Sequence, residues 1–241
     1  MKRNILHLTE TNSTNSYIRS IADEDDTLTV VVADYQIAGR GQGSNVWESE
    51  RGKNLLASVS FQPKGVAPQQ QFILSMAGAL AVGHALSTFV RDISLKWPND
   101  IYWRDRKISG TLIETAVSSR GLTRCIYGVG INVNQVTFHG DAPNPVSLRQ
   151  VLGHPVPVDE VLNRLLDSLE MMLGHVANGE YSLLRKMYHQ HLYRQCGSYP
   201  YRDAAGAFEA EIVRVEDDGH LVLRDSRGLL RSYAFKEVAF V

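Results

Sequence analysis

The sequence predicts an α+β fold followed by a small all-β domain, on the basis of three observations. The chain has 241 residues, enough for one full core and a small second domain. Up to residue 192, apolar runs of strand length alternate with helical patterns. Beyond Cys196 only short strand patterns and hairpin turns remain. We therefore expect one domain over residues 1–192 and a second over residues 193–241.

The composition is that of an ordinary globular protein. Hydrophobic residues make up 44% and charged residues 21%, and the net charge of −1 argues against broad attraction to nucleic acid or anionic lipid. Two cysteines argue against a disulfide framework and fit a reducing compartment. Residues 1–8 lack the apolar core of a signal peptide, and no apolar run is long enough to cross a bilayer. We expect a soluble, cytoplasmic protein that does not bind membranes.

The first half of the chain predicts three strands, each a short apolar run, at residues 4–10, 28–35 and 55–61. Capping side chains at residues 11–15 precede Tyr17, Ile18 and Ile21, whose spacing predicts a helix. A longer helix is predicted after Pro68, with one apolar face formed by Phe72, Ile73, Met76, Ala79, Leu80, Gly83 and Leu86. The polar segment 36–54 is a long loop, and such loops inside a compact domain are usually functional or disordered.

The second half predicts three more strands in the first domain, at residues 94–97, 107–116 and 124–133. Helices are expected at 159–176, where Val161, Leu165, Leu169 and Leu173 follow helical spacing, and at 181–192. Strands at 208–215, 220–224 and 229–235 are separated by hairpin turns at 217–219 and 226–228. This last module resembles an SH3-like barrel.

The first chemical motif is the Gly-rich loop, residues 39–47, which reads Gly39-Arg40-Gly41-Gln42-Gly43-Ser44-Asn45-Val46-Trp47. Closely spaced glycines let backbone N–H groups approach an anion, and an arginine adds a delocalised charge. The loop lacks the lysine of a P-loop and does not match the dinucleotide fingerprint. On its own it is either a ligand-binding segment or a mobile surface turn.

The second motif, Lys96-Trp97-Pro98-Asn99-Asp100, places charged and amide groups around a proline that forces a turn after a strand. These groups either converge on a ligand or form a structural corner, with Asp100 capping and Trp97 filling the core.

Two further motifs lie on predicted strands. Lys107-Ile108-Ser109-Gly110-Thr111-Leu112-Ile113-Glu114 begins with a lysine that is either functional or simply solvated. Gly128 and Gly130 interrupt the strand 124–133, and glycines there weaken packing unless another group approaches closely.

Together with Ser13-Thr14-Asn15 and Gln36, the order of these motifs resembles the catalytic domain of biotin–protein ligases, from about residue 11 to residue 134. The resemblance implies a mixed sheet flanked by helices, similar to the core of class II aminoacyl-tRNA synthetases. It also implies that biotin is adenylated by ATP, with Mg²⁺ carried by the nucleotide. The biotinyl group then passes to a lysine of a biotin carboxyl carrier protein domain.

The resemblance also implies roles for individual residues. Biotin would be bound by Ser13, Thr14, Asn15 and Gln36 at its ureido ring, with Ser58, Gly110 and Leu112 lining the pocket. Gly39, Arg40, Gly41 and Gln42 would close over its carboxylate and the α-phosphate. Lys107 would be the catalytic lysine, with Arg40 and Asp100 beside the reacting atoms and Asp100 guiding the incoming lysine. The ATP site would add Trp47 at the adenine, together with Lys96, Asn99 and Asn132.

One feature departs from the family pattern. Many members carry further arginines in this loop, where this chain has Gln42 and Asn45. We expect a weaker hold on pyrophosphate or adenylate, or compensation by another cation such as Arg51, Lys53 or Lys96.

Three other functions are open. A lipoate–protein ligase shares the fold, whereas octanoyltransferases use a cysteine nucleophile, and neither Cys125 nor Cys196 lies in a matching motif. A biotin-sensing DNA-binding repressor is disfavoured, because the first predicted strand starts near residue 4 and leaves no room for a winged helix. A metal enzyme built on His189-x-His191 lacks a visible third ligand. Whether the protein is a monomer or a homodimer, and which carrier it modifies, stays open.

Overall fold

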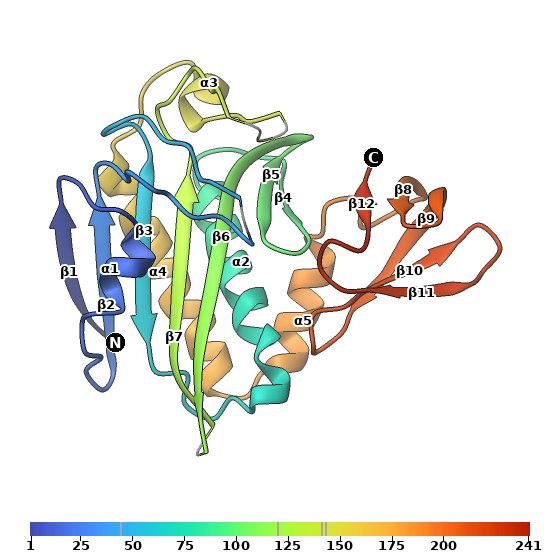
Figure 1. Cartoon of the computed structure of the whole chain (residues 1–241), viewed down its shortest axis with the longest axis horizontal. Helices are drawn as coiled ribbons and strands as arrows, with labels where there is room; N and C mark the ends of the chain where they lie inside the picture. The colour runs from blue at the N-terminus through green and yellow to red at the C-terminus, as the bar shows by residue number, and fades with distance from the viewer. Residues whose placement is uncertain (44, 120, 141, 143) are drawn as a thin grey trace.

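The computed structural model describes residues 1–43, 45–119, 121–140, 142 and 144–241, so Ser44 of the Gly-rich loop lies outside the described residues. Two β-sheets organise the chain (Figure 1). The larger sheet has seven strands in the order β1-β2-β3-β7-β6-β5-β4. Their bounds are β1 Lys2–Leu8, β2 Thr27–Ala33, β3 Leu55–Phe61, β4 Ile93–Lys96, β5 Asp100–Trp103, β6 Arg106–Ser118 and β7 Gly121–Ile131. β1 and β2 are parallel and the other neighbours antiparallel, which confirms the predicted mixed sheet.

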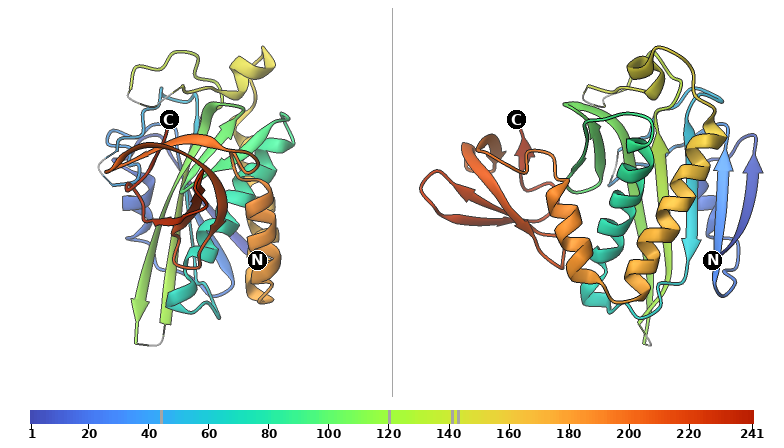
Figure 2. Two further views of the ribbon diagram at one scale, coloured as in Figure 1. Left: turned by 90° about the vertical axis from the view of Figure 1, so that its right-hand side faces the viewer. Right: turned by 180° about the vertical axis from the view of Figure 1, so that it is seen from behind.

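Helices flank this sheet on both faces. One face is covered by α2 (Phe72–Ser87), α4 (Val158–Ala177) and α5 (Tyr181–Gln190), which Figure 2 shows in front of the strands when the molecule is seen from behind. The short helix α1 (Thr14–Ile18) lies on the opposite face, against β2 and β3. Because helices cover both faces, every residue of β2 and of β3 is buried, as the run of valines at Val30–Val32 predicts.

Helix α2 differs from the prediction of a single apolar face. Twelve of its sixteen residues are buried, because it packs against α4, α5 and the β4 end of the sheet. A helix enclosed in this way needs no polar stripe. By contrast, α4 is amphipathic as predicted, and Val161, Leu165, Leu169 and Leu173 all point into the core.

The C-terminal segment forms the second sheet, with strand order β11-β10-β9-β8-β12, consistent with an SH3-like domain. Its strands are β8 Tyr199–Asp203, β9 Gly206–Val215, β10 Leu221–Asp225, β11 Leu230–Tyr233 and β12 Ala239–Phe240. Gly219 and Gly228 adopt positive φ angles of 92° and 81° in the two predicted hairpin turns. The indole Nε1 of Trp97 donates a hydrogen bond of 2.9 Å to Gly219 O and so joins the two sheets.

Several short elements were not predicted. They are β5, β8, β12, a 3₁₀ turn at Pro68–Gln70 and the helix α3 at Leu148–Leu152. β5 was missed because Asn99 and Asp100 are typical turn residues, yet Asp100 already pairs with β6 as the first residue of a return strand. Within the described part of the chain, no helix combines the length and the apolar character needed to cross a membrane.

Candidate active site

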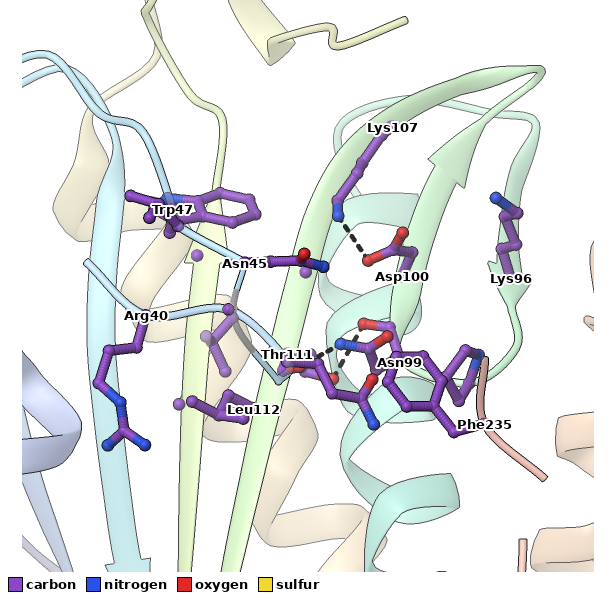
Figure 3. Close-up of a pocket in the computed structure, with 18 of the residues that line it drawn as sticks. Arg40, Asn45, Trp47, Lys96, Asn99, Asp100, Lys107, Thr111, Leu112 and Phe235 are labelled. Atoms are coloured by element: carbon purple, nitrogen blue, oxygen red, sulfur yellow. Dashed lines mark hydrogen bonds and ion pairs between the residues drawn. The ribbon is translucent and has the colours of Figure 1, made fainter. Parts of the chain in front are cut away.

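A cavity of about 410 Å³ opens between the Gly-rich loop, the strands β4 to β7 and the C-terminal domain (Figure 3). Its floor is made by glycines of β6 and β7. A methyl group on Gly128 would overlap the Asn15 amide, and one on Gly130 would overlap the Trp47 indole. The close approach expected at these two glycines is therefore confirmed.

The end of the cavity beside α1 carries a chain of polar side chains. The backbone N–H of Thr14 donates to Gln36 Oε1 at 2.8 Å, and Thr14 Oγ1 donates to the same oxygen at 3.1 Å. Ser13, Thr14 and Asn15 are each 3% exposed, so these donors and acceptors are held away from bulk water. A buried set of fixed polar groups can orient a small polar ring.

Ser58 was predicted to line the pocket, but it is not among the residues that line the cavity. Its hydroxyl is fully buried on β3, donates to Asn15 Oδ1 at 2.5 Å and lies 2.7 Å from Thr14 Oγ1. Ser58 lies opposite Gly128 and on the same face of the sheet, where Thr14 and Asn15 cover it, whereas the side chain of Ala57 packs into the core on the other face. Ser58 therefore fixes Thr14 and Asn15, the two side chains that lie between it and the cavity.

Arg40 lines the cavity, but its guanidinium does not point to Lys107. Its Nη2 lies 3.2 Å from Glu114 Oε1, and Figure 3 shows the side chain directed away from Lys107. Glu114 also pairs with Arg19 and accepts a hydrogen bond of 3.2 Å from Asn15 Nδ2. The sequence assigned no role in the site to Glu114, because its partners Asn15, Arg19 and Arg40 lie far from it in the chain.

The opposite end of the cavity brings two predicted motifs together. Lys107 Nζ lies 2.7 Å from Asp100 Oδ1, and each side chain is 19% exposed. The contact follows from the register of β5 against β6, which sets Asp100 opposite Gly110 and leaves room above the glycine. Lys107 Nζ also lies 5.7 Å from the centre of the Trp47 ring. The cavity therefore has uncharged polar groups around Thr14 and Gln36 at one end and the ammonium of Lys107 at the other.

The other residues of the second motif divide between structure and cavity. Trp97 is 4% exposed and belongs to the core, as the structural alternative predicts. Lys96 reaches the cavity, where its ammonium donates to Tyr102 Oη at 3.0 Å. Burial lowers the pKa of Lys96, and the nearby Lys107 lowers it further, while Asp100 acts in the opposite direction. Asn99 lines the cavity while its Nδ2 donates to Thr111 O at 2.7 Å.

Two more predicted residues do not reach the cavity. Gly39 is buried, and its carbonyl accepts a hydrogen bond of 3.0 Å from the backbone N–H of Trp47. Asn132 is 4% exposed and donates from Nδ2 to Val146 O at 3.1 Å, while Val146 N–H donates to Lys107 O at 2.9 Å. Asn132 thus holds the segment that fixes the backbone of Lys107, and its part in the nucleotide site stays a prediction.

Residues 8–132 match the model of the Biotin/lipoate A/B protein ligase family. The chain belongs to this family. The fold agrees over the whole chain: biotin protein ligase from Aquifex aeolicus, solved in complex with biotin and ATP, superposes with a TM-score of 0.80 at 24% identity, covering 99% of this chain and 98% of that one. The ligase from Leishmania major in complex with biotinyl-5-AMP gives a TM-score of 0.63 at 22% identity over 96% and 98%. The predicted relationship to biotin–protein ligases is confirmed.

The amino-acid sequence is also similar to those of curated biotin ligases. The biotin–[acetyl-CoA-carboxylase] ligase of Paracoccus denitrificans is 26% identical over 92% of this chain and 94% of its own length. The bifunctional ligase/repressor BirA of Bacillus subtilis is 27% identical over 86% of this chain, and the match spans 64% of that protein. The ligase of Mycobacterium tuberculosis is 32% identical over 67% of this chain and 60% of its own length.

The family match ends at residue 132, yet the C-terminal domain also lines the cavity. Sequence reasoning missed this contribution entirely, because no local pattern shows which edge of a small sheet faces another domain. The residues are Phe235, Lys236, Val238, Ala239 and Phe240.

The cysteines and histidines considered for other chemistry lie apart from the cavity. Burial raises the pKa of the Cys125 thiol to about 12, which makes it a poor nucleophile, and Cys196 is exposed and does not line the cavity. His189 Nε2 is hydrogen-bonded to Val213 O at 3.0 Å, and His191 Nδ1 to Met187 O at 2.8 Å. The described residues contain no cluster of three side chains suited to a metal ion.

Proposed function

We propose that this family member is a biotin–protein ligase that adenylates biotin and transfers it to a lysine of a biotin carboxyl carrier protein. The observation that carries the proposal is the two-ended cavity. At one end, buried polar groups around Thr14 and Gln36 suit the ureido ring of biotin. At the other end, Lys107 and Asp100 flank the place where the carboxylate would meet ATP.

In the first half-reaction a carboxylate oxygen of biotin attacks the α-phosphorus of ATP, which is bound as its Mg²⁺ complex. The bond from that phosphorus to the bridging oxygen breaks, and pyrophosphate leaves with the bonding electrons. Both reacting groups are anionic, so a fixed ammonium between them lowers the repulsion and stabilises charge in the transition state. Lys107 has this role in our proposal, and Trp47 forms the wall on which the adenine stacks.

In the second half-reaction the neutral amine of the carrier lysine attacks the acyl carbon of biotinyl-AMP. A carbon–nitrogen bond forms, the carbon–oxygen bond to AMP breaks, and the amine loses a proton. Asp100 lines the cavity and is the carboxylate available to orient that amine. No enzyme nucleophile is needed, so positioning and electrostatics supply the catalysis.

Arg40 must exchange partners in this scheme. In the structure Arg40 pairs with Glu114, and we propose that the Gly-rich loop reorders over the bound ligands so that Arg40 reaches the carboxylate or the α-phosphate. Closure would also exclude water from the hydrolysable adenylate.

The names of the relatives suggest that the carrier belongs to acetyl-CoA carboxylase. Two free cysteines fit a reducing compartment, so we place the reaction in the cytoplasm.

Lipoate ligation is the second candidate, since the family includes both activities. ATP–pyrophosphate exchange separates the two: labelled pyrophosphate should enter ATP in the presence of biotin and not of lipoate. Exchange that depends on lipoate alone would replace the proposal by the alternative.

A further inference from the structure

Four cationic side chains line the cavity among the described residues: Arg40, Lys96, Lys107 and Lys236. The first three each interact with a carboxylate or a phenol, as described above. Lys236 comes from the C-terminal domain, and no hydrogen bond or ion pair engages its ammonium within the described part of the chain. Its ammonium lies 5.6 Å from the centre of the neighbouring Phe235 ring, so a ligand could bind it without breaking an ion pair or a hydrogen bond.

Lys236 lies directly against the Gly-rich loop. A methyl group placed on Gly43 would lie 2.7 Å from Lys236 Nζ and 3.4 Å from its Cε. Gln42 and Asn45 belong to the same loop, and neither side chain carries a charge. The amide oxygen of Gln42 is buried without a hydrogen-bond partner, so the loop lacks a donor at this point.

The backbone of Lys236 is also unusual. Its φ of 72° lies in the left-handed region, which disfavours side chains other than glycine. The turn is closed by a hydrogen bond of 3.2 Å from Glu237 N–H to Ala234 O. Glycine would therefore fit the backbone of this position at least as well as lysine does.

We propose that Lys236 binds the β- and γ-phosphates of ATP and supplies from the C-terminal domain a cation beside the Gly-rich loop, in addition to Arg40 of the loop itself. The inference rests on the proposed function. A triphosphate is the most highly charged part of the substrates, and Lys107 is assigned to the α-phosphate at the reacting end. A second ammonium at the rim then stabilises the pyrophosphate that leaves. The C-terminal domain thereby becomes part of the nucleotide site.

The test compares Lys236→Gly, Lys236→Arg and a matched control, Arg104→Gly. Glycine suits the backbone at Lys236, so the first variant removes the ammonium without straining the fold. Arg104 is likewise an exposed cation with a positive φ, 52°, but it does not line the cavity. Binding is measured by calorimetry with saturating biotin, Mg²⁺ and an ATP analogue whose α–β bridging oxygen is replaced by a methylene group. AMP serves as the ligand without β- and γ-phosphates.

We expect Lys236→Gly to weaken binding of the ATP analogue about tenfold, since a charge-assisted hydrogen bond is lost, and to leave AMP binding unchanged. Lys236→Arg and Arg104→Gly should bind both ligands as the unaltered protein does. Unchanged affinity of Lys236→Gly for the analogue, or an equal loss for AMP, would overturn the inference.

The same measurements distinguish this inference from the proposed function. If the unaltered protein binds the analogue but forms no biotinyl-AMP from ATP and biotin, the proposed reaction is wrong. The comparison of Lys236→Gly with the unaltered protein then still tests whether Lys236 binds the β- and γ-phosphates. If the unaltered protein binds no nucleotide, both are overturned.

Discussion

Lys107 Nζ and Asp100 Oδ1 lie 2.7 Å apart on neighbouring strands, facing the cavity at the end opposite Thr14 and Gln36. Each side chain keeps about a fifth of its surface exposed, which leaves room for a ligand to displace one partner. A carboxylate beside the ammonium holds it in place before the substrates arrive. The pair thus connects the strand register of β5 and β6 to the proposed chemistry.

Lys107→Ala should lower the rate of biotinyl-AMP formation at least about a hundredfold, because the substitution removes the charge that stabilises the transition state. The rate is measured by single-turnover assays with saturating ATP and biotin. Lys64→Ala, which removes an exposed lysine paired with Asp25 away from the cavity, should leave the rate unchanged. A near-normal rate for Lys107→Ala would show that the role belongs to another group.

The glycines of the cavity floor predict two separable losses. In Gly128→Ala the new methyl group overlaps Asn15 and should weaken biotin binding, whereas in Gly130→Ala it overlaps Trp47 and should weaken nucleotide binding. Each should also lose about 1–3 kcal/mol of stability from overpacking. Gly174→Ala, in α4 with no atom within 4 Å of the new methyl group, is the control. The affinity of each variant for biotin and for nucleotide is measured by binding titration. If both substitutions weakened the binding of both ligands equally, the two-ended site would be contradicted.

Gln42→Arg should strengthen the hold on biotinyl-AMP. The substitution replaces a buried, unpartnered amide oxygen by donors and adds a cation to the Gly-rich loop. We expect release of the adenylate to slow about tenfold, measured by rapid dilution or by chase with unlabelled ligand. Gln69→Arg adds the same charge on an exposed segment that does not line the cavity and should have no effect. Faster release from Gln42→Arg would argue that the loop does not contact the adenylate.

Acid should unfold the C-terminal domain through Asp225. This carboxylate accepts a hydrogen bond of 2.8 Å from Arg231 Nη2 and others from the backbone N–H groups of Arg227 and Leu229. The hydrogen bond from the Arg231 guanidinium is the largest cause of a lowered pKa at Asp225, and the two N–H groups lower it further. Together they bring the pKa of Asp225 to about 2. The pKa of Asp225 is lower in the folded than in the unfolded protein. Ionised Asp225 therefore contributes fully to the free energy of unfolding above about pH 4, and this contribution is lost as the pH falls through about 2.

Thermal unfolding followed by circular dichroism over this pH range checks the prediction. Asp225→Asn should be less stable at neutral pH and should depend less on pH between about 4 and 2. Identical pH profiles for the variant and the unaltered protein would assign the acid sensitivity to other carboxylates.

The sequence predicted those parts of the fold and site that depend on local pattern. Residues 55–61 were predicted as a strand with the bounds that β3 has, and the motifs containing Lys96, Lys107 and Gly130 all meet at the cavity. Contacts between distant segments left no such signal. The pairing of Arg40 with Glu114 and the approach of Lys236 to Gly43 depend on how strands and domains pack, and periodicity does not encode that packing.

Ligase activity is tested by the mass of a biotin carboxyl carrier domain after incubation with this protein, ATP, Mg²⁺ and biotin. We expect the carrier to gain one biotinyl group on a single lysine, and we expect no gain when ATP is omitted or when Lys107→Ala replaces the unaltered protein. A carrier whose mass does not change in the complete reaction would contradict the assignment of this chain as a biotin–protein ligase.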